Sequence, residues 1–137
     1  MELSFALKVA ATSHQVWEYY ENIEKWSVWE KDLEAISLEG EFVSGTNGQM
    51  TLTGMPPMSF TLTSVVPYQE FIDLTETPMG KLSFAHYIQE IPEGVLIRHS
   101  VTLDQDNQEV LPMLSGIFND VPETMFLLKK VVESDGV

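Results

Sequence analysis

Apolar and polar residues alternate by twos at the start of the chain and again through its middle. Residues 3–9 place Leu3, Phe5, Leu7 and Val9 on one side, which predicts a half-buried strand. Similar strand-like runs follow at 35–38, 48–53, 58–66, 71–77, 81–90 and 95–103. Short turns rich in glycine and proline separate these runs, and such short connections suit antiparallel neighbours. We therefore predict an antiparallel meander.

Between the first two strand-like runs the period changes to that of a helix. Thr12, with Gln15 three positions later, resembles a capping box and predicts a helix that starts near Ser13. Its apolar face contains Val16, Trp17, Tyr20 and Ile23, and Trp26 and Trp29 continue it into a second short helix. Because tryptophan buries a large area, we expect the three tryptophans to pack in the core.

Helical spacing returns near the C-terminus. One apolar stripe contains Leu114, Phe118, Val121, Met125, Leu128 and Val132. Asp120 is a good N-cap for the terminal helix, and Pro122 then falls in the first turn, where proline is tolerated. A shorter helix or an irregular segment over 110–118 is expected to come before it.

Composition limits the class of protein. At 137 residues the chain fits a single domain, 1–137. Seven basic and twenty-one acidic residues give a net charge of −14, which disfavours binding to nucleic acid or anionic membranes. Without cysteine, the chain has no disulfide and no thiolate chemistry. No secretory signal or membrane-spanning apolar run is visible, so a cytoplasmic protein without membrane insertion is expected.

These elements predict an α+β fold in which a curved antiparallel sheet wraps around a long C-terminal helix, with two short helices after the first strand. Space left between sheet and helix is the candidate site for a small apolar ligand. Alternation along the strands and the helical stripe predict this lining: Met50, Leu52, Phe60, Leu62, Leu74, Phe84, His86, Ile97, His99, Leu114, Phe118 and Met125. On the strand 71–77, Ile72, Leu74 and Glu76 are assigned to the inner face.

His86 and His99 each lie on an otherwise apolar strand face, and the turn at 92–94 brings the two strands together. Three interpretations stay open. The two imidazoles can be a satisfied structural pair, a polar anchor or acid–base pair in the cavity, or two ligands of a metal that lacks a third. The sequence contains no phosphate-binding loop, nucleophile elbow or HExxH pair, so no cofactor is expected.

Several of these segments together resemble the START/Bet v 1-like superfamily (SRPBCC), which includes proteins described as polyketide cyclase/dehydrase and lipid-transport types. The resemblance rests on Ala11-Thr12-Ser13 followed by Val16-Trp17, on Trp26 and Trp29, on Gly40-Glu41 and Gly45, on Phe84-x-His86 and Ile97-x-His99, and on Pro122-x-x-Met125-x-x-Leu128. It covers nearly the whole chain and implies a helix-grip fold with a hydrophobic cavity. The superfamily has no single catalytic motif, so only cavity-facing positions carry over.

Three functions are compatible with the sequence. The first is a noncatalytic carrier of a small hydrophobic or aromatic molecule, lipid- or polyketide-like. The second is a polyketide cyclase or dehydratase that uses His86 or His99 as acid or base. The third is a protein-interaction module of the co-chaperone type, which predicts a broad exposed apolar patch instead of a cavity.

Overall fold

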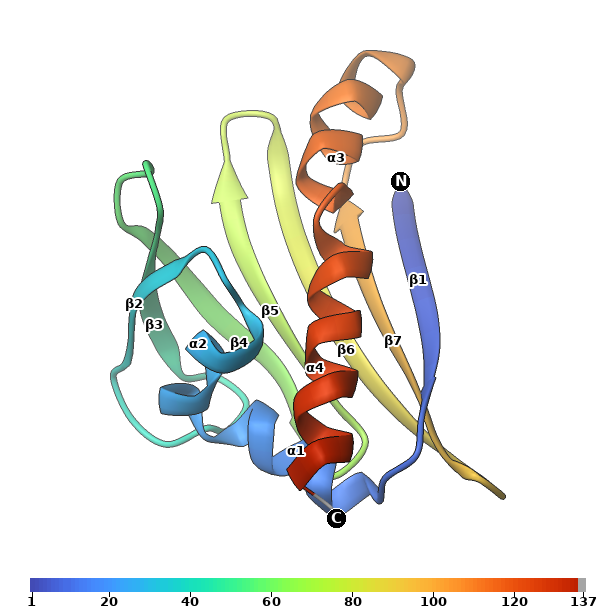
Figure 1. Cartoon of the computed structure of the whole chain (residues 1–137). Coiled ribbons are helices and arrows are strands. Elements are labelled where there is room, and N and C mark those ends of the chain that lie inside the picture. Colours follow the sequence, from blue (N-terminus) through green and yellow to red (C-terminus); the bar gives the residue numbers. More distant parts are fainter. Residues whose placement is uncertain (136–137) are drawn as a thin grey trace.

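A computed structural model describes residues 1–135 and has a single antiparallel sheet of seven strands in the order β1-β7-β6-β5-β4-β3-β2 (Figure 1). The strands are β1 (Glu2–Val9), β2 (Leu33–Leu38), β3 (Asn47–Leu52), β4 (Met58–Val66), β5 (Glu70–Thr77), β6 (Gly80–Ile91) and β7 (Gly94–Leu103). Every neighbouring pair is antiparallel, and β1 closes on β7 at one edge. The predicted meander is confirmed.

The helices fall in the two predicted regions of the chain. They are α1 (Ser13–Glu21), the 3₁₀ turn η1 (Ile23–Lys25) and α2 (Trp26–Trp29), then η2 (Gln108–Val110), α3 (Leu111–Phe118) and α4 (Val121–Asp135). The capping box at the start of α1 is formed: the Gln15 N–H donates to the Thr12 hydroxyl, and the Thr12 N–H donates to the Gln15 side chain. The α+β fold class is confirmed.

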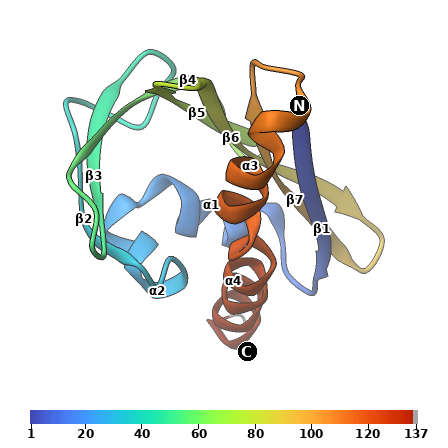
Figure 2. The same cartoon turned by 90° about the horizontal axis from the view of Figure 1, so that it is seen from above.

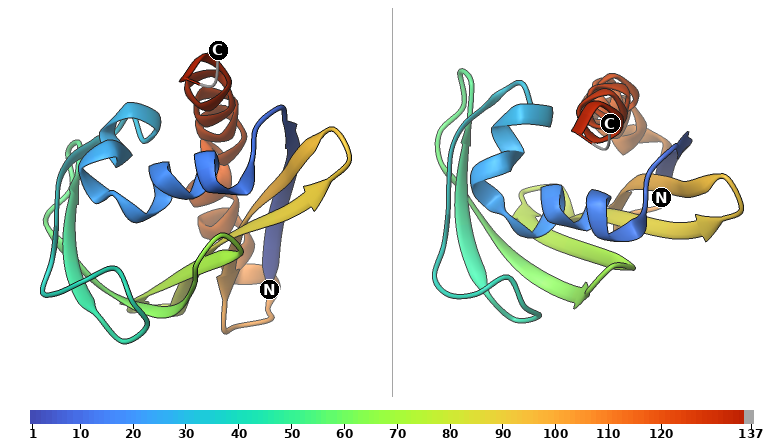
Figure 3. Two further views of the ribbon diagram at one scale, coloured as in Figure 1. Left: turned by 90° about the horizontal axis from the view of Figure 1, so that it is seen from below. Right: turned by 60° about the horizontal axis from the view of Figure 1, so that its bottom comes forward.

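The sheet curves strongly, and its concave side holds the helices (Figures 2 and 3). The terminal helix α4 lies across the concave face near β1, while α1, η1 and α2 cover one end of the sheet. At the other end, α3 contacts β7 and β1. The sheet therefore grips α4, with the short helices closing the two ends.

Cross-strand partners define rows of side chains on the concave face. In one row, Phe5 pairs with His99, His99 with His86, and His86 with Phe71. In the next row, Leu3 pairs with Val101, Val101 with Phe84, Phe84 with Asp73, and Asp73 with Leu62. Directly paired residues lie on the same side of an antiparallel sheet, so each row shares one face.

The inner face assigned to β5 from the sequence is wrong. Leu74 pairs with Ser83 and Ile72 with Ala85, which places both on the convex side, together with Glu76. The concave face of β5 instead contains Phe71, Asp73 and Thr75. Phe71 is fully buried, whereas Ile72 and Leu74 are half-buried. Burial of a large aromatic ring stabilises the fold more than burial of either aliphatic side chain, so β5 turns Phe71 toward the concave face.

The concave face contains two separate hydrophobic clusters. The first, which we call the aromatic cluster, contains the buried residues Val9, Val16, Trp17, Tyr19, Tyr20, Trp26, Trp29, Phe60, Leu62, Phe71, Ile88, Val95, Ile97, Met125, Leu128 and Val132. The second, which we call the α3 cluster, contains Leu82, Val101, Leu103, Val110 and Leu114, with Phe84, Ile117 and Phe118 packed against it. Val121, the first residue of α4, contacts both clusters.

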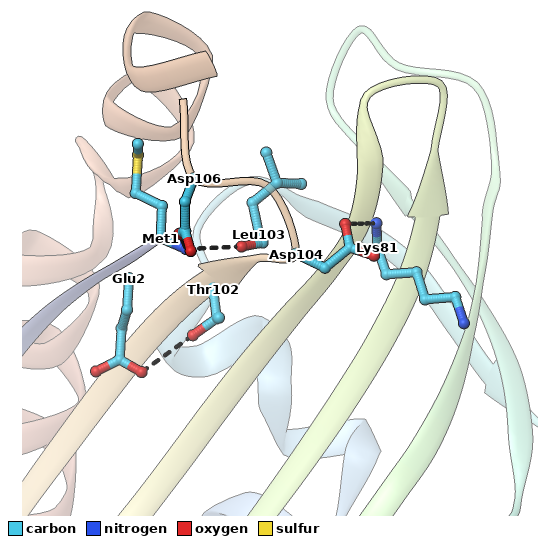
Figure 4. A network of polar contacts seen from close by, with 7 residues as sticks. All are labelled: Met1, Glu2, Lys81, Thr102, Leu103, Asp104 and Asp106. Atoms are coloured by element: carbon cyan, nitrogen blue, oxygen red, sulfur yellow. Dashed lines mark hydrogen bonds and ion pairs between the residues drawn. The ribbon is translucent and has the colours of Figure 1, made fainter. Parts of the chain in front are cut away.

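Polar contacts hold the strand ends beside the α3 cluster (Figure 4). The Met1 amino group donates to the Leu103 carbonyl at 2.9 Å and also pairs with Asp106. The Lys81 N–H donates to the Asp104 carboxylate at 2.8 Å. These contacts connect the ends of β1, β7 and β6 where the chain leaves the sheet for α3. They hold the strands together at this end of the concave face.

Candidate functional site

The two histidines lie inside the aromatic cluster, next to each other as predicted. Their ring centroids are 4.6 Å apart, with the rings nearly perpendicular. The Nε2 atom of His99 is hydrogen-bonded to the Tyr20 hydroxyl at 2.7 Å. His86 donates from Nδ1 to the Phe71 carbonyl at 3.2 Å, and its ring stacks on the Phe71 ring at 3.8 Å. Both imidazoles therefore have partners within the protein.

Burial keeps both histidines neutral. Loss of hydration lowers the pKa of His86 to about 3, although the bond to the Phe71 carbonyl acts in the opposite direction. Burial, and then the neighbouring His86, holds the pKa of His99 well below its usual value. Neutral imidazoles suit a structural pair, and the acid–base role stays a prediction.

The three tryptophans are buried in the aromatic cluster, as expected from the sequence, and the Trp29 ring lies against both imidazoles. Trp17 is 2% exposed and Trp29 is fully buried. The Trp26 indole N–H donates to the Tyr20 carbonyl at 2.8 Å, and the Trp29 indole N–H donates to the Tyr19 carbonyl at 3.1 Å. These bonds fix the rings against α1. In this half of the interior, aromatic side chains occupy the place where an open cavity was expected.

Two shallow hollows on residues 1–135 lie outside the grip. One lies along α4 beside Phe126, Lys129 and Glu133, and the other lies on the convex face of β6 and β7 beside Tyr87 and Arg98. Neither lies between α4 and the concave face.

Asp73 is the unexpected side chain of the concave face. Its neighbours in the row are Leu62, from the aromatic cluster, and Phe84, from the α3 cluster. The side chain is 3% exposed, and its Oδ1 atom has no hydrogen-bond partner. Burial, and then the charge of Glu30, raises the pKa of Asp73 to about 8. A neutral carboxylic acid thus lies at the boundary between the two clusters.

The charge of Glu30 acts on this carboxyl, and two further acidic residues act on Glu30. Glu30, which follows α2, is half-buried, and its pKa is raised to about 7 by burial and then by Asp32 and Asp120. Asp120 directly precedes α4. We call the boundary formed by Leu62, Asp73, Phe84 and Val121, with Glu30 and Asp120 beside it, the seam. Lys31, which follows Glu30, forms an exposed ion pair with Glu123 in the first turn of α4 at 2.7 Å.

The predicted lining residues divide between the two clusters. Phe60, Leu62, His86, Ile97, His99 and Met125 lie within or against the aromatic cluster, together with the half-buried Met50, while Phe84, Leu114 and Phe118 belong to the α3 cluster. Leu52 pairs with Leu33 at the β2 edge, far along the sheet from the histidines. Leu74 faces outward. Of the predicted set, only Leu62 and Phe84 belong to the seam, and most of the others lie in the aromatic cluster with the histidines.

Sequence reasoning missed Asp73 and Glu30. The available signal was weak: a charged residue inside the run Phe71-Ile72-Asp73-Leu74 reads as an outward position when Ile72 and Leu74 are taken to point inward. Within residues 1–135, no three His, Asp or Glu side chains are placed to hold a metal ion. Over the same residues, none of the helices has both the length and the apolar character to cross a bilayer.

Solved structures share this architecture over almost their whole length. Protein MLL2253 from Mesorhizobium loti is 8% identical and has a TM-score of 0.81, with 98% of each chain covered. The structure described as Ara h 8.0201 is 12% identical and has a TM-score of 0.76, with 98% of each chain covered. The Aha1 dimer from Colwellia psychrerythraea has 10% identity and a TM-score of 0.76, covering 97% of this chain and 96% of that one.

This chain has the Bet v 1-like helix-grip fold. The fold, and nothing finer, follows from identities this low. No protein-family model matches the sequence, and no curated protein matches it. The helix-grip fold thus explains where the seam lies, between the gripped helix and the sheet, while the chemistry of the seam depends on residues particular to this chain.

Proposed function

We propose that the seam binds a small molecule with an apolar body and one hydrogen-bonding group. The observation that carries the proposal is the Oδ1 atom of Asp73, a polar atom buried among apolar side chains without a partner. Leaving such a group unsatisfied costs roughly 1–3 kcal/mol, and a ligand atom that bonds to it recovers that cost.

Incomplete burial on the concave face supports the same place. Phe84 lies on β6, near the middle of the sheet, and faces inward, yet it is only half-buried. Ile117 and Phe118, at the end of α3, and Val121 are half-buried as well. Apolar side chains in the middle of a fold are normally covered, so these residues can still lose accessible surface to a ligand body.

The protein-interaction alternative has less support. It requires a broad exposed apolar patch, whereas the exposed large apolar side chains of residues 1–135 are distributed over separate elements. They are Val28, Val43, Met55, Val66, Tyr68, Met79, Leu111 and Phe126. The cyclase alternative needs an imidazole that reaches substrate and exchanges a proton near neutral pH, whereas both histidines are buried, neutral and bonded to the protein.

The test uses 2-phenylethanol, which has one aromatic ring and one hydroxyl group. We expect saturable binding and a rise in the thermal unfolding temperature, because a ligand that binds the folded chain stabilises it by mass action. The variant Val121→Trp fills the seam and should abolish the effect. Lys130→Trp, on an exposed position of the same helix, is the matched control and should bind normally.

Two results would overturn the proposal. One is the absence of any stabilisation of the parent chain by 2-phenylethanol at millimolar concentration. The other is equal binding by Val121→Trp and the parent chain, provided that both fold cooperatively, because a filled seam cannot hold a ligand in the same place.

A further inference from the structure

Strand β1 is an open edge of the sheet. In residues 1–135 it pairs with β7 on one side and has no strand on the other. Its pairing with β7 runs without a bulge over all eight residues, Glu2–Val9. The opposite edge, β2, is six residues long and has a register shift between Leu33 and Ala35. Short length and bulges discourage edge pairing, so β1 is the edge that is better suited to receive another strand.

Hydrogen bonds at the start of β1 show which of its backbone groups point outward. The Met1 amino group donates to the Leu103 carbonyl at 2.9 Å, and the Leu103 N–H donates to the Met1 carbonyl at 2.9 Å. In an antiparallel ladder such doubly bonded pairs alternate with unbonded pairs. The odd-numbered residues of β1 therefore bond to β7, and the even-numbered ones direct their N–H and C=O groups away from it. We call these even-numbered residues the outward row: Glu2, Ser4, Ala6 and Lys8.

Two side chains of α4 confirm this direction at the far end of β1. The Lys129 ammonium donates to the Lys8 carbonyl at 3.0 Å, and the Ala10 N–H donates to the Glu133 carboxylate at 2.8 Å. Both backbone groups belong to even-numbered residues, as the alternation requires. The two middle residues of the outward row are exposed, so their backbone groups are open to a further strand.

The outward row is complementary to itself in charge. When a second copy of β1 lies antiparallel with the two Phe5 residues opposite each other, Glu2 of each copy faces Lys8 of the other. Opposite charges directly across a ladder stabilise it, and like charges destabilise it. A shift of this register by two residues in either direction still pairs outward backbone groups, but it separates both charged residues from their opposite charges. The charges therefore select the register centred on Phe5.

We propose that β1 pairs with β1 of a second copy of this chain, antiparallel and about a two-fold axis at Phe5, so that one sheet continues through both copies. This inference is independent of the seam. Each outward N–H and C=O group of one strand bonds to the facing residue of the other strand. At the end of the row, the Lys8 carbonyl has a second lone pair beside the one that Lys129 uses.

The terminal helix adds apolar contact at the same axis. α4 lies beside β1 (Figure 1), and the Phe126 ring is 52% exposed and packs against Phe5 with ring centroids 6.1 Å apart. The hollow along α4 extends from this ring past Lys129 to Glu133. In a sheet that continues through a two-fold axis, both concave faces lie on the same side. The axis therefore brings the two Phe126 rings toward each other, where each loses apolar surface to the other copy.

The distribution of charge favours this edge over other surfaces. The chain has a net charge of −14, so two copies repel each other in most orientations. Three of its seven basic residues lie here: Lys8 at the end of the outward row, and Lys129 and Lys130 beside the hollow of α4. In the antiparallel pair these lysines approach the end of the other β1 at which Glu2 lies. Repulsion between the copies is thus lowest in the proposed arrangement.

Analytical ultracentrifugation and amide hydrogen exchange test the proposal. We expect the mass to rise from the 15.5 kDa of one chain toward twice that value as the concentration increases from about 1 to about 500 µM. The outward amides of Ser4 and Ala6 should exchange at least about tenfold more slowly in the concentrated sample than in the dilute one. The Phe5 amide, which bonds to β7, should be protected in both samples.

Proline variants locate the interface. Ala6→Pro removes an outward N–H but no bond to β7, so we expect it to fold. It should weaken self-association at least about tenfold, because a symmetric pair loses the bond twice. Ser4→Pro, a second variant in case the first folds poorly, should act in the same direction. Ala6→Val retains the N–H, and as the matched control it should associate as the parent chain does.

Charge reversal tests the register. Lys8→Glu and Glu2→Lys each place like charges opposite each other in a pair of identical copies, so each should weaken self-association at least about threefold. An equimolar mixture of the two variants restores opposite charges at both ends of the ladder. The mixture should therefore associate more tightly than either variant alone.

Several results would overturn the proposal. One is a parent chain that stays monomeric up to about 500 µM, whether or not it binds a synthetic peptide with the sequence Glu2–Val9, because such a peptide would show an edge open to single strands only. Another is self-association that is unchanged in both Ala6→Pro and Ser4→Pro, which would place the interface elsewhere. A third is a mixture of the two charge variants that associates no better than either variant alone.

Discussion

His86 and His99 are direct cross-strand partners on the adjacent strands β6 and β7, with ring centroids 4.6 Å apart. Each imidazole has a hydrogen bond within the protein, to the Phe71 carbonyl or to the Tyr20 hydroxyl. The pair therefore joins α1 to the sheet through Tyr20 and joins β6 to β5 through Phe71. These contacts make the aromatic cluster the rigid half of the grip.

Removing the Tyr20 hydroxyl should destabilise the fold. Tyr20→Phe keeps the ring but leaves a buried imidazole nitrogen of His99 without its partner, at a cost of about 1–3 kcal/mol. Chemical denaturation measures the loss. Tyr87→Phe, on the convex face beside Arg98, is the matched control and should change the free energy of unfolding by less than about 0.5 kcal/mol. Equal effects would mean that the Tyr20–His99 bond contributes nothing specific.

Acid should unfold the chain through the histidines. The pKa of His86 is about 3 in the folded chain and 6.5 for an exposed imidazole, so between these pH values the unfolded chain binds a proton that the folded chain does not. The contribution of His86 to the free energy of unfolding is therefore fully present above pH 6.5 and decreases as the pH falls toward 3. We expect His86→Phe, which retains the stacking on Phe71, to show a shallower acid limb in pH-dependent denaturation. An unchanged limb would contradict the assignment.

The pKa of Asp73 should make stability depend on pH in the opposite sense. Its pKa rises from 3.8 to about 8 on folding, so between these values the unfolded chain has lost a proton that the folded chain retains. Stability therefore decreases as pH rises toward 8. Asp73→Asn should raise the free energy of unfolding by more than about 1 kcal/mol at pH 8 and flatten the alkaline limb. A loss of stability at pH 8 would show that the carboxylate is favourably paired.

Much of the fold could be predicted because each element has a local cause. Alternation gave the seven strands, the Thr12–Gln15 capping box gave the start of α1, and Pro122 marked the first turn of α4. The direct pairing of His86 and His99 followed from the short turn between their strands. Local patterns of this kind do not depend on distant contacts, so a single sequence is enough to find them.

The site could be predicted only in part. Its position depends on which alternate residues of each strand face inward and on how the helices pack against the sheet. The inward face of β5 was predicted the wrong way round. Ile72 and Leu74 together suggest that their side faces inward, but the structure buries Phe71, which lies on the opposite side. That error placed Asp73 outside. The packing of Trp29 against both histidines also depends on how α1 and α2 pack on the sheet, which no local pattern determines.

The reversed face gives a direct prediction. Leu62 is fully buried on the concave face, whereas Leu74 is half-buried on the convex face. Leu62→Ala should therefore cost about 2–5 kcal/mol of unfolding free energy, and Leu74→Ala about 1 kcal/mol or less. Chemical denaturation of the two variants under the same conditions provides the comparison. The reverse order of the two losses would restore the inner face that the sequence suggested.

The central claim is that a small molecule binds at the seam and not beside the histidines. Nuclear magnetic resonance of the isotope-labelled chain with 2-phenylethanol measures this through nuclear Overhauser contacts from the ligand ring. We predict contacts to Phe84 and Val121, with the amide signal of Asp73 shifting during the titration. Contacts confined to the rings of His86, Phe71 and Trp29 would contradict the claim, because they would place the ligand in the half of the grip that the aromatic cluster fills.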